Sequence, residues 1–240
     1  MTVSGKSASI KLISLNIERT KHLDLVIPFL KEQKPDVVCI QELLERDIQK
    51  FVAAQVGEDY LYAPMLRHME TEGNPLLNIA IFTRLPIIEK NIQYYVGNSN
   101  DIPEHAPSNE TEKGHAMNCA LLTMIVKKDG TEFKIAATHF TWSKDGQPND
   151  SQRENMRKLL AVLETSGEFV LTGDFNAPRG LPGQRGEIFS MLAEKYKDNI
   201  PPHYTTSIDG NRHRAGQLNL MVDGIFSTPG YRVSNVEMVS

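Results

Sequence analysis

The segment 171–178, Leu-Thr-Gly-Asp-Phe-Asn-Ala-Pro, places a carboxylate and an amide two residues apart. The residues just before them, 168–172, are apolar and rich in β-forming types, so we predict a short buried strand. If the chain stays extended, Asp174 and Asn176 point the same way at the mouth of a sheet. A carboxylate can orient or deprotonate a water there, and an amide can donate to developing negative charge. The pair therefore suits attack by water on an anionic centre.

Glu42 is a second candidate, because it follows the apolar run 37–41, Val-Val-Cys-Ile-Gln. Such a run is too apolar for an ordinary solvated glutamate. One interpretation is a ligand for a hard divalent cation, which prefers carboxylate and amide oxygens. The other interpretation is a carboxylate at a helix N-terminus, where the macrodipole favours negative charge. Taken alone, the residue does not decide between them.

Three further polar residues stand where predicted strands end or are interrupted: Asn16, His139 and Asp223. His139 ends the run 134–138, and a lone histidine in this place is more often structural than catalytic. Asp223 interrupts an apolar strand, and a buried carboxylate needs a partner, so a structural hydrogen bond is its rival interpretation. Asn16 could be a turn residue. Each is weak alone, but several strand ends that meet at one rim would form a site.

The elements that must position these residues follow from hydrophobic periodicity. Strands are expected to outnumber helices and to form frequent hairpins, one over 77–95 and one over 117–139. This favours two packed sheets with helices outside over a doubly wound parallel sheet. Thr20 is expected to cap the first helix, in which Pro28 predicts a kink or a late start. We predict strands at 8–15, 37–40, 77–83, 87–95, 117–126, 132–139, 168–172, 222–227 and 232–238, helices at 20–34, 44–54, 150–164 and 186–196, and a long polar loop at 98–114.

The composition is that of an ordinary globular chain. Its 240 residues, 40% of them hydrophobic, suit one large domain or two small ones, and we predict a single domain over 1–240. The net charge of −4 argues against a protein held to nucleic acid by bulk charge. Cys39 and Cys119 sit in apolar runs and are expected to be reduced core thiols. With no predicted signal peptide or membrane span, we expect a monomer in the cytoplasm.

In this order, the motifs resemble those of the exonuclease–endonuclease–phosphatase superfamily, which includes pancreatic-type deoxyribonucleases, apurinic-site endonucleases, neutral sphingomyelinases and inositol polyphosphate 5-phosphatases. The Gln-Glu and Gly-Asp-x-Asn motifs are quite specific, and the others support them. By contrast, the sequence has no Walker loop, Gly-x-Ser-x-Gly elbow, His-Glu-x-x-His or Cys-x-x-Cys. The matching pieces are Ser14-Leu-Asn16, Pro35-Asp-Val-Val-Cys-Ile-Gln-Glu42, Ile79-Ala-Ile-Phe-Thr-Arg-Leu-Pro-Ile87, Thr138-His139, Gly173-Asp-Phe-Asn176 and Val222-Asp-Gly-Ile-Phe226.

The resemblance implies a four-layer α/β/β/α sandwich of two mostly antiparallel sheets, and phosphoester hydrolysis that depends on Mg²⁺ or Mn²⁺. Carried over residue by residue, it makes Glu42 the principal metal ligand, with Asn16 beside it on metal or phosphate. It makes Asp174 the base that orients the water and Asn176 a contact to the phosphoryl oxygens. His139 stands where the family has a phosphate-contacting histidine or tyrosine.

The resemblance also pairs Asp223 with a histidine in a Ser-Asp-His motif after the family's final strand. This chain stops at Ser240, after Val-Glu-Met-Val at 236–239, and no such motif follows Asp223. We expect either a truncated piece or a catalytically impaired molecule, and favour truncation because the other matched positions are intact. On this view the polypeptide lacks its last strand and catalytic histidine and is much weaker than its parent.

The substrate is left open by the sequence. Two basic loops could meet phosphates at the rim or could be ordinary solvated surface: Arg179 with Arg185, and 212–214. Trp142 could stack on a base or belong to the core. A short nucleic-acid end, a nucleotide, an inositol phosphate or a phospholipid head group all fit. The hypotheses are a phosphodiesterase or nuclease, a phosphomonoesterase on a small molecule, and a non-catalytic binding module.

Overall fold

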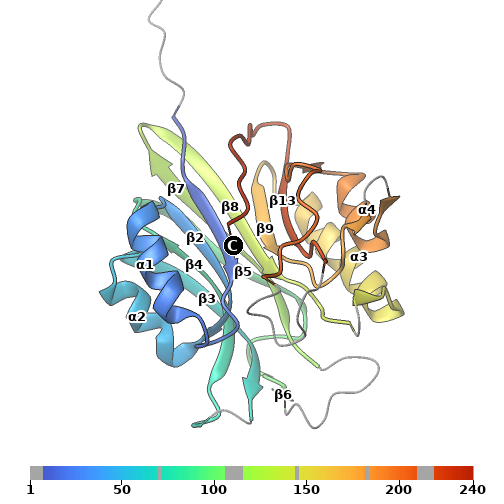
Figure 1. Ribbon diagram of the computed structural model, residues 1–240, viewed down its shortest axis with the longest axis horizontal. Coiled ribbons are helices and arrows are strands. Elements are labelled where there is room, and N and C mark those ends of the chain that lie inside the picture. Colours follow the sequence, from blue (N-terminus) through green and yellow to red (C-terminus); the bar gives the residue numbers. More distant parts are fainter. Residues whose placement is uncertain are drawn as a thin grey trace, which may run out of the picture.

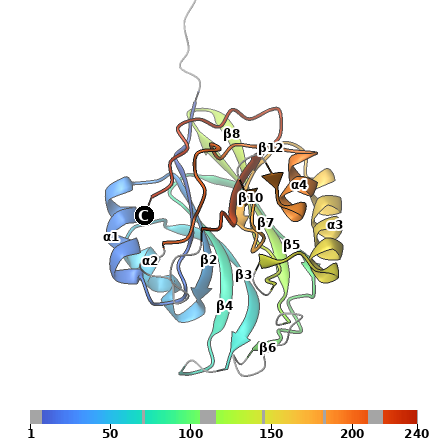
Figure 2. The same ribbon diagram turned by 45° about the vertical axis from the view of Figure 1, so that its right-hand side comes forward.

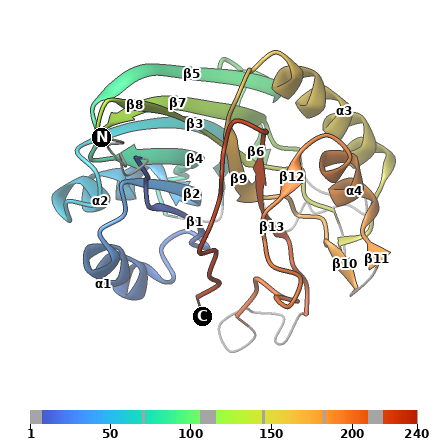
Figure 3. The same ribbon diagram turned by 90° about the horizontal axis from the view of Figure 1, so that it is seen from above.

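Two sheets packed face to face form the centre of the computed structural model, with helices on both outer faces (Figure 1). The structure describes residues 8–69, 72–105, 116–143, 146–181, 184–209 and 219–239. Seen from above, α1 and α2 cover one side of the sandwich and α3 and α4 the opposite side (Figure 3). The expected four-layer α/β/β/α sandwich is therefore confirmed.

The first sheet has the strand order β1-β2-β4-β3-β6. Its outer face packs on two helices through a separate apolar cluster that includes Leu30, Ile40, Phe51 and Phe82, all fully buried. This face explains why both helices fold here, since each carries an apolar stripe that must leave water. The elements of this half are β1 (Leu12–Asn16), α1 (Leu23–Gln33), β2 (Val37–Leu44), a 3₁₀ turn at Glu45–Asp47, α2 (Ile48–Ala53), β3 (Asp59–His68), β4 (Leu76–Thr83) and β6 (Glu104–His105).

The second sheet has the strand order β12-β13-β9-β8-β7-β5. Its inner face meets the first sheet, and its outer face carries α3 and α4, which Figure 2 shows side by side. Asn149 caps α3 by accepting a hydrogen bond from the Gln152 N–H. The elements of this half are β5 (Ile87–Val96), β7 (Cys119–Lys128), β8 (Thr131–His139), α3 (Asp150–Glu164), β9 (Val170–Asp174), β10 (Gly180–Leu181), β11 (Gln184–Arg185), α4 (Glu187–Ala193), β12 (Lys197–Asp198) and β13 (Asp223–Ser227).

Several local predictions are confirmed. The hairpin over 117–139 exists as β7 and β8, which pair antiparallel around Asp129 and Gly130. The helix predicted at 150–164 has those bounds. Cys39 and Cys119 are buried free thiols. No helix within the described ranges is long and apolar enough to span a membrane.

The predicted hairpin over 77–95 is wrong, although both of its strands exist. β4 lies between β2 and β3 in the first sheet, whereas β5 pairs with β7 in the second. Residues 84–86 connect the two sheets. A hydrogen bond from the Lys127 N–H to the Pro86 carbonyl, at 2.9 Å, fixes this connection to the second sheet. Periodicity identifies a strand but not its partner, which is why the sequence did not separate the two sheets.

Three other boundaries also differ from prediction. Residues 232–238 form no strand, because Asn235 adopts a left-handed backbone conformation (φ 54°) that interrupts extension. Thr20 is exposed and caps nothing, since α1 has His22 at its N-cap position, without a side-chain hydrogen bond. The helix expected from residue 44 begins only at Ile48, because β2 continues through Leu44. Most of the loop predicted at 98–114 lies outside the described residues.

Candidate active site

Strand register brings the candidate residues to one end of the sandwich. In the first sheet, β1 and β2 run parallel with Asn16 opposite Gln41, so Asn16 and Glu42 become neighbours. In the second sheet, β8 and β9 run parallel with His139 opposite Asp174. β13 runs antiparallel to β9, with Asp223 opposite the same aspartate. Parallel strands end at one edge of a sheet, and here the two edges face each other because β1 and β9 are in contact.

A continuous row of polar contacts crosses from one sheet to the other. The Asn16 Nδ2 donates to Glu42 Oε1 at 3.1 Å and to Asp174 Oδ2 at 3.0 Å. His139 Nε2 lies 3.9 Å from the same Asp174 oxygen. At the other end, Arg19 Nη1 lies 3.8 Å from Glu42 Oε2. Two carboxylates that are 132 positions apart in the chain therefore share one amide group.

Glu42 is placed by an irregularity in β2. The pairing of β2 with β4 shifts register between Ile40 and Leu43, and Glu42 within this bulge has φ 58°. A bulge re-aims a side chain out of the regular alternation, and a left-handed backbone at a residue other than glycine is costly. The surrounding strand is almost entirely buried, while the Glu42 side chain remains 21% exposed. The carboxylate is thus turned from a buried strand toward the end of the sandwich.

Asn176 departs from the extended geometry expected for it. β9 ends at Asp174, and Asn176 adopts a left-handed conformation with φ 48°. Its N–H donates to Asp174 Oδ1 at 2.7 Å, and its side-chain Nδ2 donates to the Phe140 carbonyl at 2.8 Å. The expected common direction from continued extension is therefore wrong, although a turn keeps the two residues in contact. In this arrangement the backbone of Asn176 orients the aspartate.

Burial and a neighbouring carboxylate act against the ionisation of Asp223. Burial and the nearby Asp174 raise the pKa of Asp223 to about 8, despite a hydrogen bond with Ser207 that acts in the opposite direction. His139 is 6% exposed, and its Nδ1 has no hydrogen-bond partner among the residues that the structure describes. A site of this kind attracts a cation.

The donor set fits a hard divalent cation that keeps much of its own water. Across the described ranges, no three His, Cys, Asp or Glu side chains come together as a group that could hold a metal ion. Mg²⁺ is commonly bound through one or two carboxylates plus water and substrate oxygens, which Glu42 and Asp174 could supply. Asn16 turns its nitrogen toward the carboxylates, and its Oδ1 accepts from the Glu18 N–H at 3.0 Å. Ligation by the Asn16 oxygen would therefore require its amide to rotate.

The row of polar residues lines an open groove of about 1820 Å³. The groove is also bordered by β1 and by residues 231–239, which run from β13 back toward β1 (Figures 1 and 3). Trp142 lines the same groove and is half-buried. Glu42, His139, Asp174, Asn176 and Asp223 all line this groove, as does Asn16.

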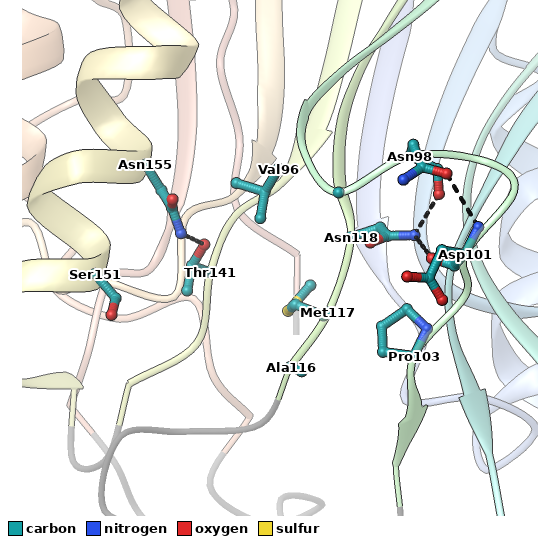
Figure 4. A pocket seen from close by; sticks show the side chains of 11 residues that line it. Val96, Asn98, Asp101, Pro103, Ala116, Met117, Asn118, Thr141, Ser151 and Asn155 are labelled. Carbon is teal, nitrogen blue, oxygen red and sulfur yellow. Dashed lines mark hydrogen bonds between the residues drawn. The ribbon is translucent and has the colours of Figure 1, made fainter.

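A smaller pocket of about 450 Å³ lies apart from these residues (Figure 4). Its lining comes from the start of α3 and from the segment after β5, and none of the predicted site residues belongs to it. Its polar groups are largely committed to the fold: Asn118 donates to the Asn98 and Asp101 carbonyls, and Asn155 donates to Thr141. The residues predicted from sequence therefore line the large groove and not this pocket.

Sequence patterns did not identify Arg19, which lies in a polar loop and reaches Glu42 only in the folded chain. They also offered Arg179 as a possible rim residue. Arg179 is instead a structural residue that pairs with the buried Asp198 at 2.9 Å and donates to the Ile200 carbonyl. The side chain of Arg185 and residues 212–214 lie outside what the structure describes.

Comparison with known proteins identifies the family of the chain. Residues 13–240 match the model of the Endonuclease/Exonuclease/phosphatase family. No curated protein matches the sequence. Solved structures of other proteins share the fold at low sequence identity.

A mannosyl-6-phosphatase of Bacteroides thetaiotaomicron is 16% identical, with TM-score 0.59, covering 92% of this chain and 86% of that one. The catalytic domain of human Nocturnin with a bound sulfate anion is 16% identical, with TM-score 0.61 and coverages of 92% and 82%. A hairpin-deletion mutant of Staphylococcus aureus beta toxin is 18% identical, with TM-score 0.59 and coverages of 97% and 92%. By its family match over almost the whole length, this chain belongs to the Endonuclease/Exonuclease/phosphatase family.

Proposed function

We propose that the protein hydrolyses phosphoesters with the help of Mg²⁺ or Mn²⁺, and that its substrate is a phosphodiester. Members of its family are generally phosphoester hydrolases. The observation that carries the proposal is the single Asn16 amide that binds both Glu42 and Asp174, at 3.1 and 3.0 Å. It supports the proposal because the candidate metal carboxylate and the candidate base bind the same amide.

The roles of the residues follow from their contacts. Glu42 would hold the cation, which when bound neutralises charge on the phosphoryl and leaving oxygens. Asp174 accepts the proton of a water or orients it, and the Asn176 N–H and Asn16 amide fix the direction of its two oxygens. His139 lies beside the same aspartate, where an imidazole can donate to a phosphoryl oxygen.

The open shape of the groove supports a diester over a monoester. The groove that Asp174 lines is also lined by Trp142 and by residues 231–239, so it has room for more than a phosphoryl group. A diester carries a second organic group on phosphorus and can use this room. The buried free thiols Cys39 and Cys119 are consistent with a reducing compartment, and the proposal includes a monomer in the cytoplasm.

The test is turnover of bis-(p-nitrophenyl) phosphate with Mg²⁺ or Mn²⁺, compared with p-nitrophenyl phosphate and DNA. Activity is expected to disappear with a chelator. D174N is expected to lower kcat about 100-fold or more while leaving Mn²⁺ binding largely intact, because it removes the base and not the main ligand. The matched control is D150N, at an exposed aspartate on α3.

Faster turnover of p-nitrophenyl phosphate than of the diester would indicate that the substrate is a small phosphorylated molecule. Mn²⁺ binding without turnover of any of the three substrates would favour a binding module. Equal activity of D174N and the wild-type protein would contradict the site assignment.

A further inference from the structure

Arg19 is the one arginine that the structure places against the carboxylate proposed for the cation. Its Nη1 lies 3.8 Å from Glu42 Oε2, and the two side chains are 29% and 21% exposed. This distance gives electrostatic attraction without a hydrogen bond, so the pair is weak and can separate. Arg19 also lines the large groove, so its guanidinium borders the space open to a substrate.

The backbone around Arg19 holds it in this place. Ile17 is fully buried in the cluster beneath α1, and its N–H donates to the Gln41 carbonyl at 3.2 Å. The next N–H, from Glu18, donates to Asn16 Oδ1 at 3.0 Å. Glu18 and Arg19 then both take left-handed conformations, with φ 44° and 67°. Two successive residues in this region are costly, which indicates a loop shaped by its surroundings.

The other basic side chains of the loop lie near a different carboxylate. Lys21 Nζ lies 2.6 Å from Glu18 Oε2, and His22 Nε2 lies 4.0 Å from the same oxygen. Both side chains also line the groove, but they lie against Glu18. Arg19 alone of the three is directed to Glu42, and through Asn16 it is joined to Asp174.

We propose that Arg19 is a phosphate-binding residue that Glu42 holds until a divalent cation takes that carboxylate. A cation at Glu42 neutralises the carboxylate and repels the guanidinium, which then turns its planar N–H groups to phosphoryl oxygens in the groove. The inference rests on the proposed function and adds the group that recognises the phosphate. It also makes cation and phosphate binding dependent on each other through one side chain.

The test measures the two ligands separately in the variants R19Q and R19K. Without substrate, R19Q is expected to bind Mn²⁺ about two- to fivefold more tightly, because a competing positive charge on a partly exposed pair is gone. With saturating Mg²⁺, R19Q is expected to bind inorganic phosphate about tenfold or more weakly, because a charge-assisted contact is lost. R19K keeps the positive charge but not the planar set of N–H donors. Its Mn²⁺ affinity should therefore stay near that of the wild-type protein, while its phosphate affinity should lie between those of the wild-type protein and R19Q.

Electron paramagnetic resonance of free Mn²⁺ and calorimetry with phosphate give these affinities without any turnover. The control is R157Q, since Arg157 pairs with Glu154 on α3, remote from the groove. Opposite shifts for cation and phosphate support the proposal. Unchanged affinities in R19Q would overturn it. So would weaker binding of both Mn²⁺ and phosphate, because that result indicates a structural role for Arg19, which circular dichroism of the variant would check. If the wild-type protein itself binds no Mn²⁺, the proposed function fails first.

Discussion

The site is built around one neutral amide that holds two acidic groups together. Asn16 donates one N–H group to each carboxylate, at 3.1 and 3.0 Å, but an amide cannot cancel their charge. Among the residues that the structure describes, the basic side chains recorded against these two carboxylates are Arg19 at 3.8 Å and His139 at 3.9 Å, both beyond hydrogen-bond distance. The residues therefore form a preorganised but electrostatically incomplete arrangement, which a divalent cation would complete.

The incompleteness predicts a pH effect on the metal-free protein, through Asp223. Burial and Asp174 raise the pKa of Asp223 to about 8, whereas an unfolded aspartate titrates near 3.9. Between these values the folded chain holds a proton that the unfolded chain releases. The contribution of Asp223 to stability is therefore full below about pH 4 and is lost as pH rises toward 8.

The variant D223N should accordingly flatten the decline in melting temperature from pH 5 to 8, measured in the presence of a chelator. Other groups also titrate in this range, so the meaningful quantity is the difference between D223N and wild type. D198N is an unsuitable control because Asp198 is buried against Arg179, and the exposed D150N serves instead. A difference curve that stays flat across this range would show that Asp223 ionises normally.

At the scale of elements, the position of Asp174 depends on how closely β9 approaches β8. Gly173 lies opposite Thr138 in the parallel pair, and a Cβ added at Gly173 would lie 1.9 Å from the Thr138 carbonyl oxygen. No side chain fits there unless the strands separate. We therefore expect G173A to destabilise the protein by about 1–3 kcal/mol, as overpacking does, and to lower kcat because Asp174 moves relative to His139.

The control for this prediction is G167A. Gly167 has φ 70° and open space around its Cβ position, so alanine costs stability through the backbone alone. Urea unfolding of both variants and kcat at a temperature where both remain folded separate the two effects. The prediction fails if G173A retains full kcat, because the close approach would then have no part in placing the aspartate.

Prediction from sequence succeeded where the signal is local and failed where it depends on partners. The helix at 150–164 and the hairpin at 117–139 follow from periodicity and a turn sequence that neighbouring residues carry. The crossover at 84–86 depends on which sheet each strand joins, and Arg19 depends on a contact 23 positions away. The bulge that directs the Glu42 side chain could not be predicted from the sequence either, because it arises from the pairing of β2 with β4.

The candidate residues themselves were found because each ends or interrupts an apolar run. The structure brings four of them to one groove: Asn16, Glu42, His139 and Asp174. From the sequence, this meeting of strand ends was only an expectation. The turn at Asn176 could not be predicted, since its left-handed backbone follows from hydrogen bonds to Asp174 and Phe140. The positions of candidate residues were thus predictable where a polar residue interrupts an apolar run. The directions in which their side chains point were not predictable.

At the scale of the whole molecule, the site lies at the seam between the two sheets. Asn16 and Glu42 come from the first sheet, and His139, Asp174 and Asp223 come from the second. Only the Asn16–Asp174 hydrogen bond, at 3.0 Å, links the two sets among the bonds that the structure records there. A cation held by Glu42, with a water that Asp174 orients, would add a second link across the seam. Binding at the site would then stabilise the packing of the entire sandwich.

Mg²⁺ or Mn²⁺ is therefore expected to raise the melting temperature of the whole chain in a single transition. At 100 times its Kd, a ligand that binds only the folded state adds about 2.7 kcal/mol. E42Q should lose most of this shift, whereas E45Q, three residues later and exposed, should keep it. NaCl at equal ionic strength separates binding from screening. If E42Q gained as much stability from Mn²⁺ as the wild-type protein, the cation would lie elsewhere and the seam would not be the metal site.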